Sequence, residues 1–197
     1  MSCKRFRVVK PEIRVLGIDD GVFTPHARGF ALIVGVVFRG GYWLDGVMHT
    51  RVRVDGMDAT RKIMSMIVNS PHRRQLRIIM FDGVTCAGFN VVDIEKLSHQ
   101  TSLPVIAVTR EKPNLSEIRK ALQNLPQGER RWAIIRRLGE PIEVHTGVEN
   151  AKVYMQIAGI FEEDARKVLL ATSTRSSLPE ALRAAHLIAS GVTSVTL

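Results

Sequence analysis

The sequence predicts a mixed α/β fold in which three antiparallel strands precede parallel strands, with helices packed on the sheet. Long β-branched runs joined by short links occupy the chain up to residue 54. Beyond that point, apolar residues at helical spacing alternate with short apolar runs that are typical of buried strands. An antiparallel meander followed by helix–strand alternation indicates one sheet covered by helices.

The antiparallel part comprises three predicted strands. The first covers residues 13–19, and the next two cover 30–38 and 42–54, with Gly40-Gly41 as the turn between them. Arginine and valine alternate in "RVRV" near the end of the third strand, which is the period-2 pattern of a half-exposed strand. Because tight links join the three strands, antiparallel pairing is the simplest arrangement.

The alternating part begins at Asp58, which stands at the start of a predicted helix, "DATRKIMSMIVNS" (58–70). The apolar run "LRIIMFDGV" (76–84) predicts a buried strand that ends in Asp-Gly. "VVDIEKLSHQTS" (91–102) predicts a helix, and "LPVIAVTREKP" (103–113) predicts another buried strand closed by proline.

The C-terminal part predicts four helices and two short strands. The first of these helices has Asn114 as its expected cap, with Glu117 three residues later. The expected helices are 114–126, 129–139, 161–173 and 178–191, and the expected strands are 141–148 and 153–159.

The composition favours a single domain, residues 1–197, because 45% hydrophobic and 24% charged residues are ordinary for a soluble globular protein. No apolar run approaches the ~20 residues that span a bilayer, so no membrane association is expected. The N-terminus lacks the apolar core of a secretory signal. Cys3 and Cys86 cannot form a disulfide framework and fit a reducing cytoplasm.

The formal charge of +9 is the most informative bulk property. A basic domain attracts polyanions, of which nucleic acid is the commonest. The alternative is a lysine- and arginine-rich surface that only keeps the protein solvated. The oligomeric state stays open, with a homodimer among the options.

Carboxylates follow two of the predicted strands. Asp19 and Asp82 each end an apolar run, and they would face each other if those strands are adjacent and parallel. Two close carboxylates repel, and a divalent cation such as Mg²⁺ removes that cost while leaving room for a phosphate oxygen. Asp20 and Asp58 are further candidate ligands, although Asp20 also fits a turn and Asp58 a helix cap. An aspartate-nucleophile phosphatase is disfavoured, because Gly21 stands two residues after Asp19.

Basic residues are candidates for nucleic-acid contact. Arg110 and Lys112 follow the strand "PVIAV" and would overhang the sheet edge that carries the aspartates. In "RRWAIIRR", Arg130, Arg137 and Trp132 share one helical region suited to phosphate contact and base stacking, or to a solvated helix face.

The six histidines show no paired spacing that would indicate a zinc site. His186 stands among apolar residues of a predicted helix, in "LRAAHLIAS". This context predicts a packed histidine rather than a ligand.

The motifs "VLGIDDG", "VDGMDAT", "IIMFDGVTCAGFNVVDI", "LPVIAVTREKPN" and "LPEALRAAHLIAS" resemble those of an archaeal family related to endonuclease V, the endonuclease dU family. The resemblance covers essentially the whole chain. It implies a ribonuclease H-like fold and an endonuclease that acts on deoxyuridine.

Endonuclease V is the more distant relative, and each of its site residues is compared separately with a position of this sequence. Its first metal aspartate matches Asp19 in "GID", and its second matches Asp82 in "FDG". The glutamate that opens the intervening helix corresponds to Asp58, which is one methylene shorter. Its lysine after the next strand falls on Arg110, with Lys112 as the alternative.

Two features of endonuclease V have no evident counterpart in this sequence. Its late histidine, which precedes the last helix, would fall near Thr174, where no histidine stands. A Pro-Tyr-Ile-Pro strand-separating wedge is also missing.

The expected function is a Mg²⁺- or Mn²⁺-dependent endonuclease on deaminated DNA containing uracil or hypoxanthine, with RNA as an open alternative. A non-catalytic nucleic-acid-binding module and a structural or regulatory protein are the rival hypotheses. The expected metal ligands are Asp19, Asp82, Asp58 and Asp20, the first three also being catalytic, and the expected nucleic-acid contacts are Arg110, Lys112, Arg130 and Arg137.

Overall fold

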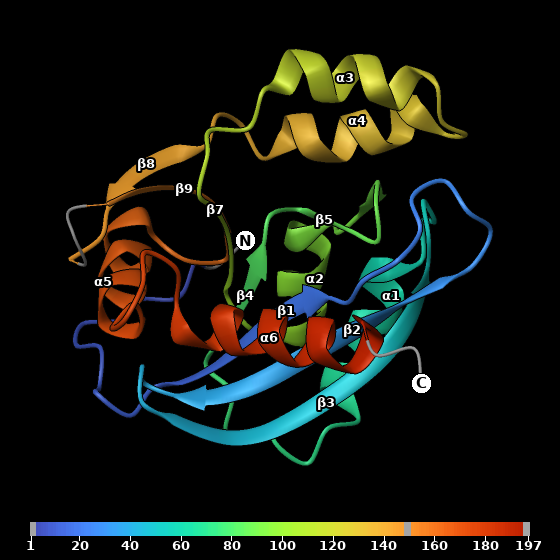
Figure 1. Cartoon of the computed structure of the whole chain (residues 1–197). Helices are drawn as coiled ribbons and strands as arrows, with labels where there is room; N and C mark the ends of the chain where they lie inside the picture. The colour runs from blue at the N-terminus through green and yellow to red at the C-terminus, as the bar shows by residue number, and fades with distance from the viewer. Residues whose placement is uncertain (1–2, 148–150, 195–197) are drawn as a thin grey trace.

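A computed structural model describes residues 3–147 and 151–194, and its centre is a seven-stranded mixed sheet (Figure 1). The strand order is β3-β2-β1-β4-β7-β9-β8. The first three strands pair antiparallel, β1, β4 and β7 run parallel, and β9 returns antiparallel between β7 and β8. The strands are β1 (Arg14–Asp20), β2 (Phe30–Arg39), β3 (Trp43–Arg53), β4 (Ile78–Asp82), β7 (Val105–Thr109), β8 (Ile142–His145) and β9 (Lys152–Ala158).

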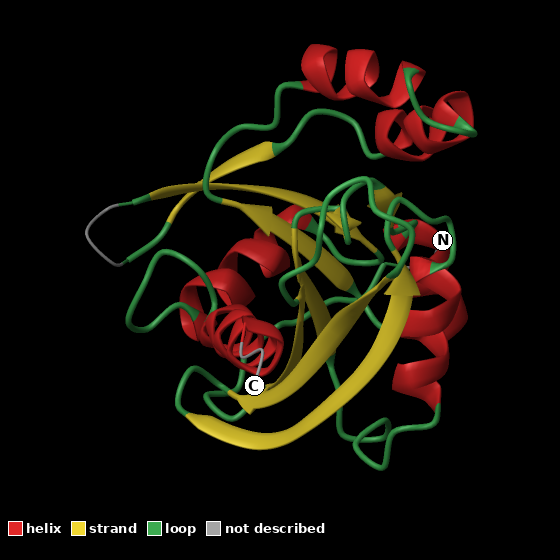
Figure 2. Ribbon diagram, turned by 45° about the vertical axis from the view of Figure 1, so that its right-hand side comes forward, coloured by secondary structure: helices red, strands yellow, loops and turns green. Residues whose placement is uncertain are grey.

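Helices cover both faces of the sheet, as Figure 2 shows. The helices α1 (Ala59–Val68) and α2 (Ile94–Thr101) pack on one face, and α5 (Glu162–Thr172) and α6 (Glu180–Ser194) pack on the other. None of the helices in the described ranges combines the length and apolar character that a bilayer crossing requires. The expected mixed α/β architecture is therefore confirmed.

A helical hairpin of α3 (Leu115–Gln123) and α4 (Gly128–Arg137) stands beyond the sheet (Figure 1). It contributes to a small separate core in which Leu122 and Ile135 are buried against Val91. The Asn114 side chain accepts hydrogen bonds from the first-turn amides of α3, as the sequence predicts.

The alternation of side chains along β1 decides which face each carboxylate occupies. Val15 packs in the core under α5 and α6, whereas Leu16 and Ile18 pack in the core under α1 and α2. Because successive strand residues point to opposite faces, Asp19 belongs to the α6 face and Asp20 to the α1 face.

The parallel ladder between β1 and β4 brings the two strand ends together. Its last pair joins Ile18 and Phe81, so Asp19 and Asp82 stand level, one residue further along. Neighbouring strands lie about 4.8 Å apart, and residues at matched positions point to the same face. The predicted neighbourhood of Asp19 and Asp82 at one sheet edge follows from this register.

Two glycines of β1 and the following turn let α6 lie directly on the strand. A Cβ atom on Gly17 would overlap the backbone of Ala181, and one on Gly21 would lie 2.7 Å from the side chain of Thr193. Thr193 Oγ1 also accepts a hydrogen bond from the Val22 amide at 2.7 Å, which fixes the strand end to the helix. Both glycines share the face of Asp19, so the helix reaches that side chain.

A two-stranded hairpin, β5 (Thr85–Cys86) and β6 (Asn90–Val91), precedes α2 where the sequence predicts helix from residue 91. Its turn uses Ala87 and Gly88 in the left-handed region, at φ 47° and 82°. The helix begins only after Asp93, whose side chain caps it by accepting from the Lys96 amide at 3.0 Å.

Other boundaries differ by a few residues. Residues 110–113 leave the sheet beyond Thr109, and α6 continues past 191 to Ser194. The predicted strand 141–148 ends at His145, and its last residue lies outside the described residues.

Candidate active site

The carboxylates of Asp19 and Asp82 form the centre of the site at the carboxyl edge of the sheet. Burial raises the pKa of Asp19 to about 7, and the charges of Asp20 and Asp82 act in the same direction. Burial also raises the pKa of Asp82, partly offset by the positive charge of Arg110. Both groups therefore carry negative charge at an electrostatic cost that a bound cation would relieve.

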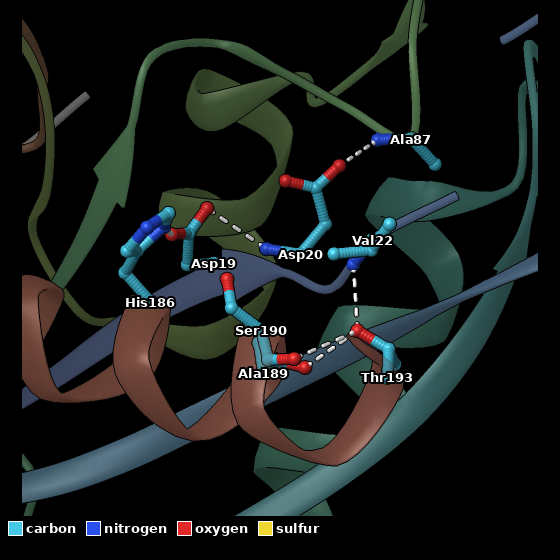
Figure 3. A network of polar contacts seen from close by, with 8 residues as sticks. All are labelled: Asp19, Asp20, Val22, Ala87, His186, Ala189, Ser190 and Thr193. Atoms are coloured by element: carbon cyan, nitrogen blue, oxygen red, sulfur yellow. Dashed lines mark hydrogen bonds and ion pairs between the residues drawn. The ribbon is translucent and has the colours of Figure 1, made fainter. Parts of the chain in front are cut away.

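His186 lies at this centre, so its prediction as a packed core histidine was wrong. Its Nδ1 is 2.9 Å from Oδ2 of Asp19, and 61% of its side chain is exposed (Figure 3). Leu182, Ala185 and Ala189 of the same stretch are buried against the sheet, whereas Leu187, the next residue after His186, is exposed. The chain thus supplies a late histidine from the last helix itself rather than from the segment around Thr174.

A signal for His186 was present in the sequence. Gly17, Asp19 and Gly21 alternate in "GIDDG" and share one strand face, which indicates a close helix approach. The small buried residues Ala181 and Ala185 of α6 complement those glycines. A helix held that near to the strand brings its adjacent polar side chain to the strand's carboxylate.

Asp20 points away from Asp19, toward the β5–β6 hairpin. Its Oδ2 accepts a hydrogen bond from the Ala87 amide, while the Asp20 amide donates to Oδ1 of Asp19 at 2.8 Å (Figure 3). Asp20 therefore holds the hairpin against the strand end and orients the neighbouring carboxylate.

Asp58 occupies the N-cap position of α1 but makes no capping hydrogen bond with its side chain. Its Oδ1 accepts from Asn90 Nδ2 at 2.8 Å and from the Arg53 amide at 3.2 Å. Asn90 Oδ1 takes over the cap by accepting from the Ala59 amide at 3.0 Å. Burial raises the pKa of the nearby Cys86 thiol, and the charges of Asp20, Asp58 and Asp19 act in the same direction.

The four predicted nucleic-acid contacts fall into different settings. Arg110 is exposed at the end of β7 and lies within electrostatic reach of Asp82. Lys112 Nζ lies 3.9 Å from Glu140, and Arg137 binds Asp93 and Glu95 at 2.9 and 3.1 Å. Arg130 is exposed on α4, with Nη1 3.4 Å from the side chain of Gln127. The fold brings only Arg110 to the carboxylate pair.

Arg131, which follows the exposed Arg130 on α4, is a buried residue that anchors the α3–α4 hairpin. Only 2% of it is exposed. Its guanidinium donates to the carbonyls of Pro126, Gly56 and Asp55 at 3.1, 2.7 and 2.7 Å, and also to that of Phe89. Burial lowers the pKa of this guanidinium. These contacts tie α4 to the loop before α1 and to the β5–β6 hairpin.

The donor set suits a hard divalent cation. Asp19 and Asp82 supply carboxylate oxygens, which are the ligands that Mg²⁺ prefers. Within residues 3–147 and 151–194, no group of three or more His, Cys, Asp or Glu side chains is assembled as a metal site. A cation between the pair would thus keep several ligands from water or from a phosphate, as Mg²⁺ commonly does.

Comparison with known proteins gives the family. The family model described as "Endonuclease dU" matches residues 11–193. A UPF0215 protein of Methanothermobacter thermautotrophicus is 51% identical over 194 residues, covering 98% of this chain and 94% of that protein. A UPF0215 protein of Pyrococcus furiosus is 43% identical over 188 residues, covering 94% and 95% of the two chains.

Solved structures show the same fold. A protein of unknown function from Archaeoglobus fulgidus matches with a TM-score of 0.81 and 36% identity, over 91% of this chain and 98% of that one. Bacillus subtilis endonuclease V matches with a TM-score of 0.62 and 10% identity, over 98% and 86% of the chains. Ciona intestinalis endonuclease V, in complex with a DNA containing an inosine, matches with a TM-score of 0.58 and 12% identity, over 88% and 82%.

The family and the fold together support a nuclease. The chain belongs to the endonuclease dU family and has the ribonuclease H-like fold of endonuclease V.

Proposed function

We infer that this protein is a metal-dependent endonuclease that hydrolyses phosphodiester bonds in deaminated, uracil- or hypoxanthine-containing DNA. The observation that carries the proposal is the cluster of Asp19, Asp82 and His186 at one sheet edge. The chain belongs to the endonuclease dU family, and this membership supports a hydrolytic role for the cluster.

Asp19 and Asp82 would hold Mg²⁺ or Mn²⁺ between them. When bound, such an ion would supply positive charge to a phosphate oxygen and to the leaving oxygen. The two side chains fit this task because burial and mutual repulsion already disfavour their ionised forms without a cation.

His186 is placed to handle a proton beside the carboxylates. Its Nδ1 faces Asp19, and in the described part of the chain its Nε2 makes no hydrogen bond. The exposed Nε2 can therefore donate a proton to a leaving oxygen or accept one from a water molecule.

Arg110 would bind the phosphate next to the cut, because it is exposed and stands beside Asp82. Lys112, two residues after Arg110, would contact a neighbouring phosphate after release from Glu140. In this proposal Arg130 and Arg137 contact nucleic acid outside the site, Arg137 by exchanging Asp93 for phosphate.

Asp58 and Asp20 have supporting roles in this proposal. Asn90 and the Arg53 amide fix the Asp58 carboxylate, which suits a group that orients water or joins the metal when substrate is bound. Asp20 keeps the β5–β6 hairpin in place beside the strand end.

The proposed substrate draws on the family and on the fold. The family is described as endonuclease dU, and the Ciona endonuclease V binds an inosine-containing DNA. Enzymes that act on one base of a duplex displace it from the stack, and an altered, weakly paired base lowers that cost.

The missing histidine near Thr174 favours the rival hypothesis of a non-catalytic binding module. His186 supplies a histidine in contact with the first aspartate, which favours catalysis over binding alone.

A nicking assay with Asp82→Asn tests the proposal. The substrates are duplexes carrying one deoxyuridine, one hypoxanthine or no lesion, with Mg²⁺ or with a chelator. Wild type should nick a lesion duplex only with metal, and Asp82→Asn should reduce the rate by at least about 100-fold. Glu163→Gln, which removes an exposed carboxylate from α5, is the matched control and should cut like wild type.

Unchanged nicking by Asp82→Asn would remove the carboxylate pair from the mechanism. Cleavage of all three duplexes at one rate would leave a nuclease but overturn the deaminated substrate. Preferential nicking of hypoxanthine-containing RNA would move the substrate class to RNA, where uracil is an ordinary base.

A further inference from the structure

A basic pocket lies at the end of the sheet opposite the carboxylates. We name it the amino-edge pocket, a cavity of about 460 Å³. Its cationic walls come from the N-terminal segment, the start of β1 and the turn before β4. The side chains that define it are Lys10, Arg14, Arg74 and Arg77, beside the apolar Phe6 and Val8.

The pocket is well separated from the candidate active site. Arg14 is the first residue of β1 and Asp20 is the last. Six steps of about 3.3 Å put roughly 20 Å between them. The pocket therefore takes no part in the chemistry at the carboxylates.

Most of its positive charge has no acidic partner. In residues 3–147 and 151–194, Lys10, Arg74 and Arg77 have no carboxylate oxygen within 4.0 Å. Arg77 Nη1 donates to the backbone carbonyls of Arg74 and Leu76 at 3.2 and 3.3 Å. These cations are free to bind an external anion.

The acids nearby are already shared among cations. The Asp45 carboxylate accepts hydrogen bonds from Arg14 Nε at 3.1 Å and from Arg39 Nη2 at 3.0 Å. Glu12, which lines the pocket, lies 3.8 Å from the same Arg39. These two acids balance Arg14 and Arg39, so the excess positive charge of the pocket comes from Lys10, Arg74 and Arg77.

The neighbouring Lys4 is affected by the positive charge of these arginines. Its pKa is lowered by burial and then by the charges of Arg77 and Arg73. Positive charge is concentrated enough here to disfavour a further cation, and an anion would relieve that repulsion.

The shape and chemistry suit a phosphodiester chain rather than a single small anion. Several cations from three chain segments can bind more than one phosphate, and arginine can bind phosphate oxygens in pairs. Phe6 and Val8 offer apolar surface to sugar or base atoms beside the phosphates.

We propose that the amino-edge pocket is a second nucleic-acid contact, which binds backbone phosphates flanking the bond that is cut. The proposal rests on the proposed function for the identity of the polynucleotide. A separation of roughly 20 Å corresponds to about six base pairs along a duplex, at 3.4 Å per pair. The contact makes affinity depend on duplex length beyond the lesion.

The test compares two charge-matched double variants in chelator, so that binding is measured without cleavage. Arg74→Gln with Arg77→Gln removes two charges from the pocket. Lys152→Gln with Arg166→Gln removes two charges from exposed surface pairs on β9 and α5. Binding of a lesion duplex of about 24 base pairs is followed against salt concentration, because each lost phosphate contact lowers the slope by about 0.9.

The pocket variant should lower the salt slope by about 1 to 2 and weaken binding of the long duplex about tenfold or more at 0.1 M salt. The control variant should follow wild type. A hairpin-closed duplex of about 8 base pairs centred on the lesion reaches only about 13 Å to each side, so both variants should bind it equally.

Equal losses in the two variants would show a general charge effect and overturn the proposal, as would equal losses on the long and short duplexes. Saturable binding of a mononucleotide that the pocket variant abolishes, with duplex binding intact, would reassign the pocket to a free nucleotide. Nicking with metal is measured separately on each protein. A wild type that shows the length-dependent contact but never nicks would retain the pocket and refute the nuclease.

Discussion

His186 Nδ1 lies 2.9 Å from Oδ2 of Asp19, although 167 positions of the chain separate the two residues. The contact joins the last helix to the first strand. It exists because Gly17 and Gly21 let α6 lie on β1. The site therefore depends on a packing detail as much as on its polar residues.

His186→Ala should lower kcat for lesion nicking by about 10²- to 10⁴-fold, the usual range for loss of a general acid or base. The fold should persist, because most of the His186 side chain is exposed. Steady-state nicking and thermal unfolding measure both effects. His99→Ala, at an exposed position on α2, is the control, and equal activities of the two variants would exclude a catalytic role for His186.

Asp82→Asn should raise Tm in chelator, because burial penalises the ionised Asp82 carboxylate above its ordinary pKa of 3.8. Adding Mg²⁺ should then stabilise wild type, by about 2.7 kcal/mol at 100 times Kd, but not the variant. Calorimetry with and without metal checks this. A variant that gains as much from Mg²⁺ as wild type would place the metal elsewhere.

Gly17→Ala should destabilise the protein by at least about 1–3 kcal/mol, because the added methyl group overlaps the backbone of Ala181. It should also reduce nicking by displacing His186. Gly191→Ala, within α6 and facing open space, should instead stabilise by about 0.5–1 kcal/mol. Urea unfolding of both variants measures the contrast, and similar effects would contradict the close contact of α6 with β1.

Arg131→Met should cost about 3 kcal/mol, because it leaves partly buried carbonyls of three segments without their donor. Limited proteolysis should then cut near the α3–α4 hairpin before the sheet unfolds. Arg130→Met, one residue earlier and exposed, should stay within about 0.5 kcal/mol of wild type. Equal protease resistance of the two variants would show that Arg131 does not anchor the hairpin.

Asp164 should link stability to pH. Its buried carboxylate accepts from the Phe6 amide at 2.8 Å and lies 3.4 Å from Lys167 Nζ, and these contacts hold its pKa below the ordinary 3.8. This stabilisation is fully present above the ordinary pKa and is lost as pH falls through the lower, folded-state pKa. Urea unfolding of wild type and Asp164→Asn should show a constant gap above about pH 5 that closes in strong acid. A gap that does not change with pH would assign the effect to packing.

Much of the fold was predictable because each element carries its own local signal. The apolar runs of β1 and β4 and the helical spacing of α1 set their types, and the register that joins Ile18 to Phe81 places the two aspartates as expected. The β5–β6 hairpin escaped prediction because two-residue strands carry no periodicity and left-handed Ala87 has no sequence signature.

The polar side chains were predicted less well because tertiary contacts decide their roles. His186 has apolar neighbours in sequence yet faces outward on its helix, and Arg131 sits in a run of exposed arginines yet is buried. Asp58 starts a helix as predicted, but Asn90 performs the capping. The observed roles differ from the predicted ones because local sequence patterns do not specify the direction in which a side chain points.

Within residues 3–147 and 151–194, the Arg131 guanidinium donates only to main-chain carbonyls, those of Asp55, Gly56, Phe89 and Pro126. Because its hydrogen bonds go to the main chain, this anchor does not depend on the side chains of those segments. Side chains of these segments can accordingly differ without loss of the anchor, and the backbone beside the candidate active site keeps one shape.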